Sequence, residues 1–189
     1  MASAFSHAIA AVAIGKISRA VGWPGELAKV DTRFWWLLAF CGAIPDIDAI
    51  GFWMGVSYDS VWGHRGITHS LFFAALLSVV VVYFFYREQK MFSRGWLFLF
   101  LVFFAATASH GMLDAMTGGG PKVRGVAFFA PFYDARYFFP FRPILVSPIS
   151  ITRFFSERGW QVLQNEFIWV WIPSIIVMAL ASLIKKLRT

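Results

Sequence analysis

The chain has 189 residues, of which 59% are hydrophobic and 14% charged, and its mean hydropathy is +0.65. Soluble domains usually contain about 45–50% apolar residues and about a quarter charged ones, so this composition excludes an ordinary soluble domain and predicts a membrane protein. The one cysteine, Cys41, excludes intrachain disulfides and cysteine-rich metal sites. The length predicts a single domain, residues 1–189.

The net charge of +7 would suggest a nucleic-acid partner in a soluble domain. Here the basic residues lie between apolar segments, where they set the orientation of membrane spans and contact lipid phosphate. The sequence therefore argues against nucleic acid and indicates membrane lipids as partners.

Five apolar segments predict an all-α, integral membrane helical bundle. A bilayer core of about 30 Å requires roughly 20 apolar residues in a helix. Lys16 and Arg19 shorten the clean apolar part of the first segment, which could instead be a partly buried helix of the bundle. The segments are Phe5–Val21, Phe34–Met54, His69–Tyr86, Gly95–Met116 and Phe167–Ile184.

Lysine and arginine are concentrated at three places that five spans would put on one side of the membrane. By the positive-inside rule this side is cytoplasmic. These residues are Lys16, Arg19, Lys29, Arg33, Arg87, Lys90, Arg94, Lys185, Lys186 and Arg188.

The remaining basic residues would lie on the opposite side, most of them in the stretch Thr117–Glu166. Its repeated Phe, Pro and Arg (APFYDARYFFPFRPI) indicate an ordered, non-cytoplasmic interfacial loop with short helices. The residues are Arg65, Lys122, Arg124, Arg136, Arg142, Arg153 and Arg158.

Several ionisable residues lie in or beside the apolar segments, where they are costly and indicate function. His110 and Asp114 are four residues apart, so both face one side of a helix. His64 and His69 are separated by Gly66, and Thr68 is a candidate N-cap for the third segment, which would let both histidines converge.

The motif PDID places Asp46 and Asp48 two residues apart. On a helix the two carboxylates point well away from each other, so only one is expected to bind a metal directly, unless Pro45 ends the regular helix. Both remain candidates.

The predicted helices place these histidines and aspartates at a similar depth in the membrane. At 1.5 Å per residue, Asp46, His110 and Asp114 lie roughly 18, 21 and 27 Å from the basic side, and His7 and His69 begin their segments at the remote side. All 4 histidines of the chain belong to this layer. Taken singly, His7 could be a core histidine, His110 and Asp114 a buried pair, and PDID a capped helix end.

Their common depth favours a metal site near the non-cytoplasmic surface. Imidazole and carboxylate ligands suit zinc most, with manganese or iron as alternatives, and a site with open positions would be catalytic. We expect one to three ions. The candidate ligands are His7, Asp46, Asp48, His64, His69, His110 and Asp114.

Such a site could hydrolyse a phosphoester, because a divalent metal lowers the pKa of water toward 7 and can clamp phosphate oxygens. The candidate catalytic residues are Asp46, Asp48 and Arg65, whose guanidinium would stabilise the developing phosphate charge. Loop residues could bind an anionic phosphate-containing substrate or simply reach lipid headgroups. They are Lys122, Arg124, Arg136 and Arg142.

The pattern H…PDID…HRGITHS…HxxxDxxT resembles that of bacterial inner-membrane proteins described as membrane-bound metal-dependent hydrolases, also as LexA-binding, inner-membrane-associated hydrolases. The likeness covers His7 to about Thr117. It implies a multi-pass protein of the inner membrane whose metal ligands are the residues named above. The second description implies a regulatory protein partner, which no residue of this chain identifies.

The order of these residues also looks like that of zinc-dependent phospholipase C and single-strand nucleases. Those enzymes use further downstream histidines and acids, whereas this chain has no histidine after His110. Asp134, Glu157 or Glu166 could take their place.

The sequence thus predicts a metal-dependent hydrolase that cleaves a phosphoester of a lipid or lipid-linked substrate with a metal-activated water. The alternative is a proton- or metal-ion-coupled transporter that uses the His/Asp cluster as a relay. A relay requires polar groups at several depths. The only polar residues in the segments Leu76–Phe85 and Leu97–Ala106 are Ser78 and Tyr83, which argues against a relay. A purely structural membrane protein would leave the histidines unexplained.

Overall fold

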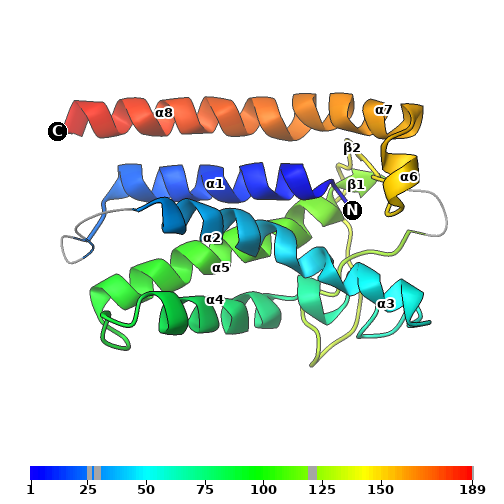
Figure 1. Cartoon of the computed structure of the whole chain (residues 1–189), viewed down its shortest axis with the longest axis horizontal. Coiled ribbons are helices and arrows are strands. Elements are labelled where there is room, and N and C mark those ends of the chain that lie inside the picture. Colours follow the sequence, from blue (N-terminus) through cyan, green and yellow to red (C-terminus); the bar gives the residue numbers. More distant parts are fainter. Residues whose placement is uncertain (25–26, 28–30, 119–122, 189) are drawn as a thin grey trace.

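The computed structural model describes residues 1–24, 27, 31–118 and 123–188, and it is a bundle of helices (Figure 1). The predicted all-α membrane class is confirmed. Lys29 and Lys122, which the sequence placed in the cytoplasmic and outer loops, lie outside the described residues.

The elements follow one another in short connections, apart from one long loop between β1 and α6. They are α1 (Ala4–Val21), α2 (Thr32–Ala43), the 3₁₀ helix η1 (Ile44–Ala49), α3 (Ile50–Trp53), the 3₁₀ turn η2 (Ile67–His69), α4 (Leu71–Phe85), α5 (Arg94–Ala115), β1 (Thr117–Gly118), β2 (Ile144–Leu145), α6 (Ile151–Phe154), α7 (Glu157–Glu166), the π-helical turn η3 (Phe167–Trp171) and α8 (Ile172–Arg188).

Four helical stretches are long and apolar enough to cross a membrane: Ala4–Val21, Thr32–Trp53, Arg94–Ala115 and Glu157–Leu187. The first segment therefore reaches spanning length despite Lys16 and Arg19. The third does not, because α4 has 15 residues. It begins at Leu71, and its N-cap is Ser70, whose hydroxyl accepts the N–H of Phe73 at 3.1 Å. The prediction that Thr68 is this N-cap is wrong.

The second and fifth segments also differ from the prediction. Pro45, which lacks an N–H, stands at the start of η1, where regular α-helix gives way to a 3₁₀ helix. In the fifth segment, helix begins at Glu157, so the interfacial loop ends earlier than predicted. Near the end of α7, the Asn165 side chain holds this helix to the loop, accepting the N–H of Leu145 at 2.7 Å and donating to the Pro143 carbonyl at 3.1 Å.

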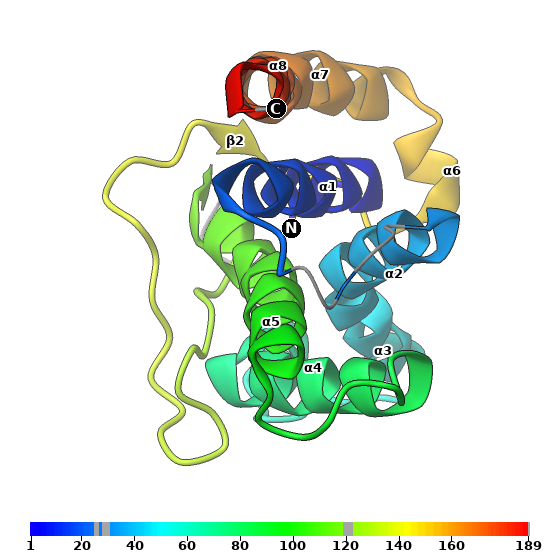
Figure 2. The same ribbon diagram turned by 90° about the vertical axis from the view of Figure 1, so that its left-hand side faces the viewer.

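Helix α1 is the centre of the bundle and packs against α2, α5 and α8, while α4 packs against α5. Figure 2 shows α8 lying over α1, with α2 and α5 beneath and α4 at the bottom. Gly42 permits the close approach of α2 to α1, because a Cβ there would lie 2.6 Å from both the Ala11 Cβ and the His7 carbonyl oxygen.

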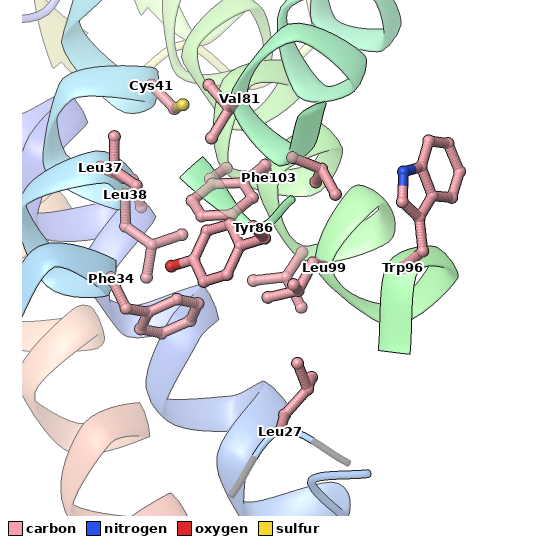
Figure 3. Packing of buried hydrophobic residues seen from close by; sticks show 14 residues of the cluster. Leu27, Phe34, Leu37, Leu38, Cys41, Val81, Tyr86, Trp96, Leu99 and Phe103 are labelled. Atoms are coloured by element: carbon pink, nitrogen blue, oxygen red, sulfur yellow. The ribbon is translucent and has the colours of Figure 1, made fainter. Parts of the chain in front are cut away.

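The buried core occupies the half of the bundle beside the basic loops. Phe34, Leu38, Val82, Leu99 and Phe103 from α2, α4 and α5 contact one another there, with ring contacts such as Phe34 to Phe103 at 5.8 Å between centroids (Figure 3). Aromatic and branched side chains of complementary shape give this half its packing.

The long loop closes the opposite end. Its strand β2 pairs in parallel with β1, with Thr117 opposite Ile144. Farther out, the N–H of Ala127 donates to the Arg65 carbonyl at 3.0 Å, and the N–H of Leu71 donates to the Phe128 carbonyl at 2.9 Å. The loop therefore lies directly against the HRGITHS segment.

Candidate metal centre

The predicted ligands come together at the end of the bundle remote from the basic loops. His7 lies in the first turns of α1, Asp46 in η1, His69 at the end of η2, and His110 and Asp114 in the last turns of α5. The side chains of the other four are buried, and Asp46 is partly buried, with a side-chain exposure of 9%.

Asp46, His69, His110 and Asp114 form an inner cluster, in which one ligand atom from each residue lies within 4.8 Å of the others. The Nε2 atoms of His69 and His110 are 3.0 Å apart. Asp46 Oδ1 lies 3.3 Å from His110 Nε2, and Asp114 Oδ2 lies 3.5 Å from His69 Nε2. Two imidazoles and two carboxylates therefore face one common point.

The backbone of α2 fixes the His110 ring. Its Nδ1 lies 2.7 Å from the Gly42 carbonyl oxygen. A carbonyl only accepts hydrogen bonds, so Nδ1 carries the proton and Nε2 presents its lone pair to the inner cluster.

Asp48 and Thr68 together fix the His69 ring, because its Nδ1 lies 3.0 Å from the Thr68 hydroxyl oxygen, which is itself bonded to Asp48. Asp48 Oδ2 lies 3.1 Å from His69 Nδ1 and also accepts the Arg65 N–H at 3.2 Å and the Thr68 hydroxyl. Asp48 Oδ1 is 2.7 Å from His64 Nδ1. Asp48 and His64 thus flank the inner cluster behind His69, while Asp46 faces into it.

The 3₁₀ geometry of η1 explains this division. At about three residues per turn, positions two apart point in clearly different directions. In the sequence, Asp46 and Asp48 are equally good candidates for the metal ligand. The structure gives them different neighbours.

His7 covers the inner cluster from α1. Its ring stacks on His110 with centroids 3.6 Å apart, and its Nε2 lies 3.4 Å from Asp114 Oδ1. Both ring nitrogens of His7 and both carboxylate oxygens of Asp46 are buried without a hydrogen-bond partner. Buried polar groups are almost always bonded, so this concentration of unsatisfied atoms indicates a site that takes a ligand.

The two histidines beside the spans differ in charge preference. Burial lowers the pKa of His64, and its hydrogen bond with Asp48 only partly offsets this. Burial also lowers the pKa of His69, but the close carboxylates of Asp114, Asp46 and Asp48 outweigh it, so the pKa of His69 lies well above its usual value. The carboxylates therefore favour positive charge at the centre of the inner cluster.

Arg65 is completely buried, and its guanidinium makes two hydrogen bonds and an ion pair, in which Nε has no hydrogen bond of its own. Nε lies 3.0 Å from Asp114 Oδ2, Nη2 donates to Thr117 Oγ1 at 2.8 Å, and Nη1 donates to the Arg124 carbonyl at 3.0 Å. Its φ of 64° costs of the order of 1–3 kcal/mol for a residue other than glycine. This backbone conformation directs the Arg65 guanidinium toward Asp114. The Oδ1 atom of Asp114 also lies 3.9 Å from the Met1 amino group.

The predicted substrate-binding residues of the long loop have other partners. Arg136 donates to the backbone carbonyls of His64, Tyr58 and Ser60. The Nε of Arg124 lies 2.8 Å from Asp59 Oδ1, and Arg142 lies over the Phe138 ring. None of the three contacts the inner cluster in the described part of the chain.

The downstream acids also lie elsewhere. Glu166 is buried, but it accepts the Ser3 N–H at 2.6 Å, the Ser6 hydroxyl at 2.7 Å and the Ser3 hydroxyl. It holds the start of α1, where the Ala2 N–H donates to Asp114 Oδ1 at 2.8 Å. Asp134 and Glu157 are exposed. The sequence missed the role of Glu166, although an acid directly before an apolar run indicates a buried partner.

Comparison with known proteins gives a family for this chain. The family model described as YdjM inner membrane protein matches residues 1–188. The "Inner membrane protein YbcI" of Escherichia coli strain K12 is 36% identical over 147 residues, which cover 76% of this chain and 82% of that protein. No solved structure matches. Both names confirm the expected inner-membrane family and mention no hydrolase or phospholipase. This chain therefore belongs to the YdjM inner membrane protein family.

Proposed function

We propose that this protein is a metal-dependent hydrolase that cleaves a phosphoester of a lipid or lipid-linked substrate. One observation carries the proposal. The Nε2 atoms of His69 and His110 face each other at 3.0 Å between two carboxylates, while the Nδ1 atom of each ring already faces an acceptor. With both rings neutral at Nε2, two lone pairs would face each other at this distance, and a cation between them, either a proton or a metal ion, relieves the repulsion.

The donor set fits a divalent metal ion. Asp46, His69, His110 and Asp114 would bind it, and His7 lies beside this set, with its Nε2 3.4 Å from Asp114 Oδ1. Two imidazoles and two carboxylates suit zinc, with manganese or iron as alternatives. Asp48 and the Gly42 carbonyl would act as the outer partners that fix ligating histidines in metal sites.

A divalent ion held there would lower the pKa of a water toward 7 and polarise a phosphoryl oxygen. Among the protein groups, Arg65 would keep Asp114 ionised and in place, which is the role its buried contacts support. His7, whose nitrogens have no hydrogen-bond partner, could take up or deliver a proton beside Asp114. Asp46, the most accessible of the four, would mark the side from which substrate enters.

The surroundings of the site support a lipid-linked substrate. Large aromatic side chains are exposed near this end, including Trp53 in α3 at 80% and Phe132 in the long loop at 81%. Aromatic residues collect at the membrane interface, where their rings meet lipid headgroups. By the positive-inside rule, this end would be non-cytoplasmic, opposite the basic loops.

A transporter is the weaker alternative. Between the inner cluster and the basic loops, α4 and α5 contact each other through aliphatic and aromatic side chains. Ser78, a polar residue at this depth, donates its hydroxyl proton to the Ala74 carbonyl of its own helix at 2.6 Å. A relay would need groups free to exchange protons or ions there.

The test begins with elemental analysis of the detergent-purified protein beside a His110→Ala, Asp114→Ala variant, with Asp31→Asn as a control at the opposite end. We expect about one or more equivalents of zinc, manganese or iron in the wild type and control, and loss in the double variant. The loaded wild type should then release product from a phospholipid or phosphodiester panel. A metal-free wild type after zinc reloading, or equal hydrolysis by the double variant, would overturn the proposal.

A further inference from the structure

A groove of about 670 Å³ opens between α3 and α6, at the same end of the bundle as the inner cluster. Phe52 and Trp53 of α3 form one wall, and Ile149, Ser150, Thr152 and Arg153 form the other. Both short helices are visible at this end in Figure 1. The volume lies in the usual range for small-molecule sites, about 300–1,000 Å³.

We propose that this groove binds the phosphate-bearing headgroup of a membrane phospholipid. The inference rests on the proposed function, because it gives that reaction its substrate and the residues that hold it. None of the groove residues is among the substrate-binding candidates that the sequence suggests, which are Arg65 and basic residues of the aromatic loop.

Charge is the first argument. Within the described part of the chain, the Arg153 guanidinium takes part in no hydrogen bond or ion pair, and no acidic residue lines the groove. Arg65 and Arg136 are consumed by the protein, and Arg124 pairs with Asp59. The Ser150 and Thr152 hydroxyls are bonded to each other at 2.9 Å, which leaves one of their two protons free. Together with the Arg153 guanidinium, this proton offers donors that phosphate oxygens accept.

The walls supply the second argument. Trp53 is 80% exposed, Ile149 is also exposed, and both belong to the same groove as Arg153. A free phosphate ion would gain nothing from indole and aliphatic surface. A phospholipid has an anionic headgroup beside apolar chains, and this combination matches the two kinds of lining.

Position is the third argument. The Phe52 ring lies 5.7 Å from the His64 ring, and His64 bonds Asp48, which in turn holds His69. On the other side, Ile149 also lines a smaller pocket of about 210 Å³ that reaches Met1 and Ser3. The intervening Ala2 N–H donates to Asp114. Both sides of the groove therefore adjoin residues that support the inner cluster.

The experiment uses the full-length, zinc-loaded protein in detergent and measures binding of dihexanoyl phosphatidic acid by isothermal titration calorimetry. The variant is Arg153→Gln, and the matched control is Arg158→Gln, an exposed arginine that does not line the groove and, among the described residues, donates only to the Val146 carbonyl, at 3.4 Å. Loss of a charge-assisted contact should weaken binding roughly tenfold or more in Arg153→Gln and leave the control unchanged. Trp53→Ala should weaken binding severalfold.

Two further ligands show whether binding requires the phosphate group, the acyl chains or both. Dihexanoylglycerol, which lacks phosphate, should bind weakly and equally to wild type and Arg153→Gln, and inorganic phosphate should compete poorly. Unchanged affinity in Arg153→Gln, an equal loss in Arg158→Gln, or inorganic phosphate competing as well as the lipid would overturn the assignment.

Failure of lipid binding in the groove can be distinguished from failure of the hydrolase proposal. If Asp46→Asn removes zinc and hydrolysis but leaves lipid binding intact, both proposals stand. If the wild type binds lipid through Arg153 but neither holds metal nor hydrolyses a substrate, the groove stands and the hydrolase fails. If hydrolysis of phospholipid is normal in Arg153→Gln, the hydrolase stands and the groove fails.

Discussion

The same helices have two different halves. Beside the basic loops, α2, α4 and α5 meet through Phe34, Leu38 and Phe103, which are buried and apolar. At the other end, continuations of the same elements bring Asp46 and His110 together, with unsatisfied polar atoms buried among them. We call these the apolar half and the polar half.

The difference separates stability from chemistry. The apolar half gains its stability from close packing, which needs no ligand. In the polar half, Arg65 offsets the cost of burying the Asp114 carboxylate, but Asp46 has no hydrogen-bond partner and needs a bound cation or a proton. A change in one half should therefore affect a different measurement from a change in the other, and the following predictions test that separation.

The largest effect is expected in the apolar half. Phe103→Ala removes a ring that contacts Phe34 and Tyr86, and should lower the free energy of unfolding by about 3–5 kcal/mol, because a cavity remains. Thermal unfolding in detergent measures this loss, while zinc content per folded molecule should not change. Phe132→Ala, at an exposed ring, is the matched control and should leave the unfolding temperature unaltered. Zinc loss in folded Phe103→Ala would break the separation.

In the polar half, Asp46→Asn should weaken zinc binding by at least about a hundredfold, since it replaces a carboxylate that faces both imidazoles. The metal-free variant should be no less stable than the metal-free wild type, because a buried charge without a hydrogen-bond partner is removed. Chelator competition and thermal unfolding give the two values. Asp31→Asn, at the N-cap of α2, should leave zinc affinity unchanged. A destabilised Asp46→Asn with normal zinc affinity would favour an ordinary buried network.

Asp48 supports the inner cluster from behind, so its loss should have a smaller effect. Asp48→Ala should weaken zinc binding by about 10- to 100-fold, and Asp48→Asn, which can still accept from His69 Nδ1, should recover part of it. The absorption spectrum of the cobalt-substituted protein should shift in Asp48→Ala, because the His69 ring is no longer fixed. An unchanged spectrum and affinity would show that Asp48 does not orient the ligand.

The smallest effects are expected from the loss of either of two equivalent helix caps. Ser70 caps α4 in the polar half and Ser93 caps α5 in the apolar half, accepting from Phe73 at 3.1 Å and from Trp96 at 3.2 Å. Alanine at either position should cost about 1 kcal/mol of unfolding free energy. Only Ser70→Ala, next to His69, should also weaken zinc binding. Equal zinc affinity in both variants would mean that the cap and the ligand are independent.

The sequence was sufficient for the parts that depend on regular helix. The rise per residue placed His110 and Asp114 at the depth of Asp46, and their spacing placed both on one face. The lengths of the apolar runs predict five apolar helices; the structure contains all five with shifted ends, and one of them, α4, is shorter than a membrane span.

Long-range contacts could not be predicted. The 3₁₀ turn at Pro45, which gives Asp46 and Asp48 different neighbours, depends on how α2 meets the rest of the bundle. The partner of His110 Nδ1 is a backbone carbonyl, Gly42, which leaves no trace in side-chain identity. Arg65 looked available for a substrate because its partner, Asp114, is far away in sequence.

The length of α4 has a consequence for the lipid around the protein. Its 15 residues span about 22 Å, roughly 8 Å less than a typical hydrocarbon core, and side chains such as Leu76 and Phe84 are exposed along it. If α4 faces lipid along its whole length, the bilayer has to become thinner beside it to keep the polar residues at its two ends out of the hydrocarbon, at a cost that grows with membrane thickness. Since α4 begins directly after His69, we expect the compressed rim to adjoin the polar half. Bilayers of longer-chain lipids should therefore strain this rim more, and membrane thickness would itself influence the protein.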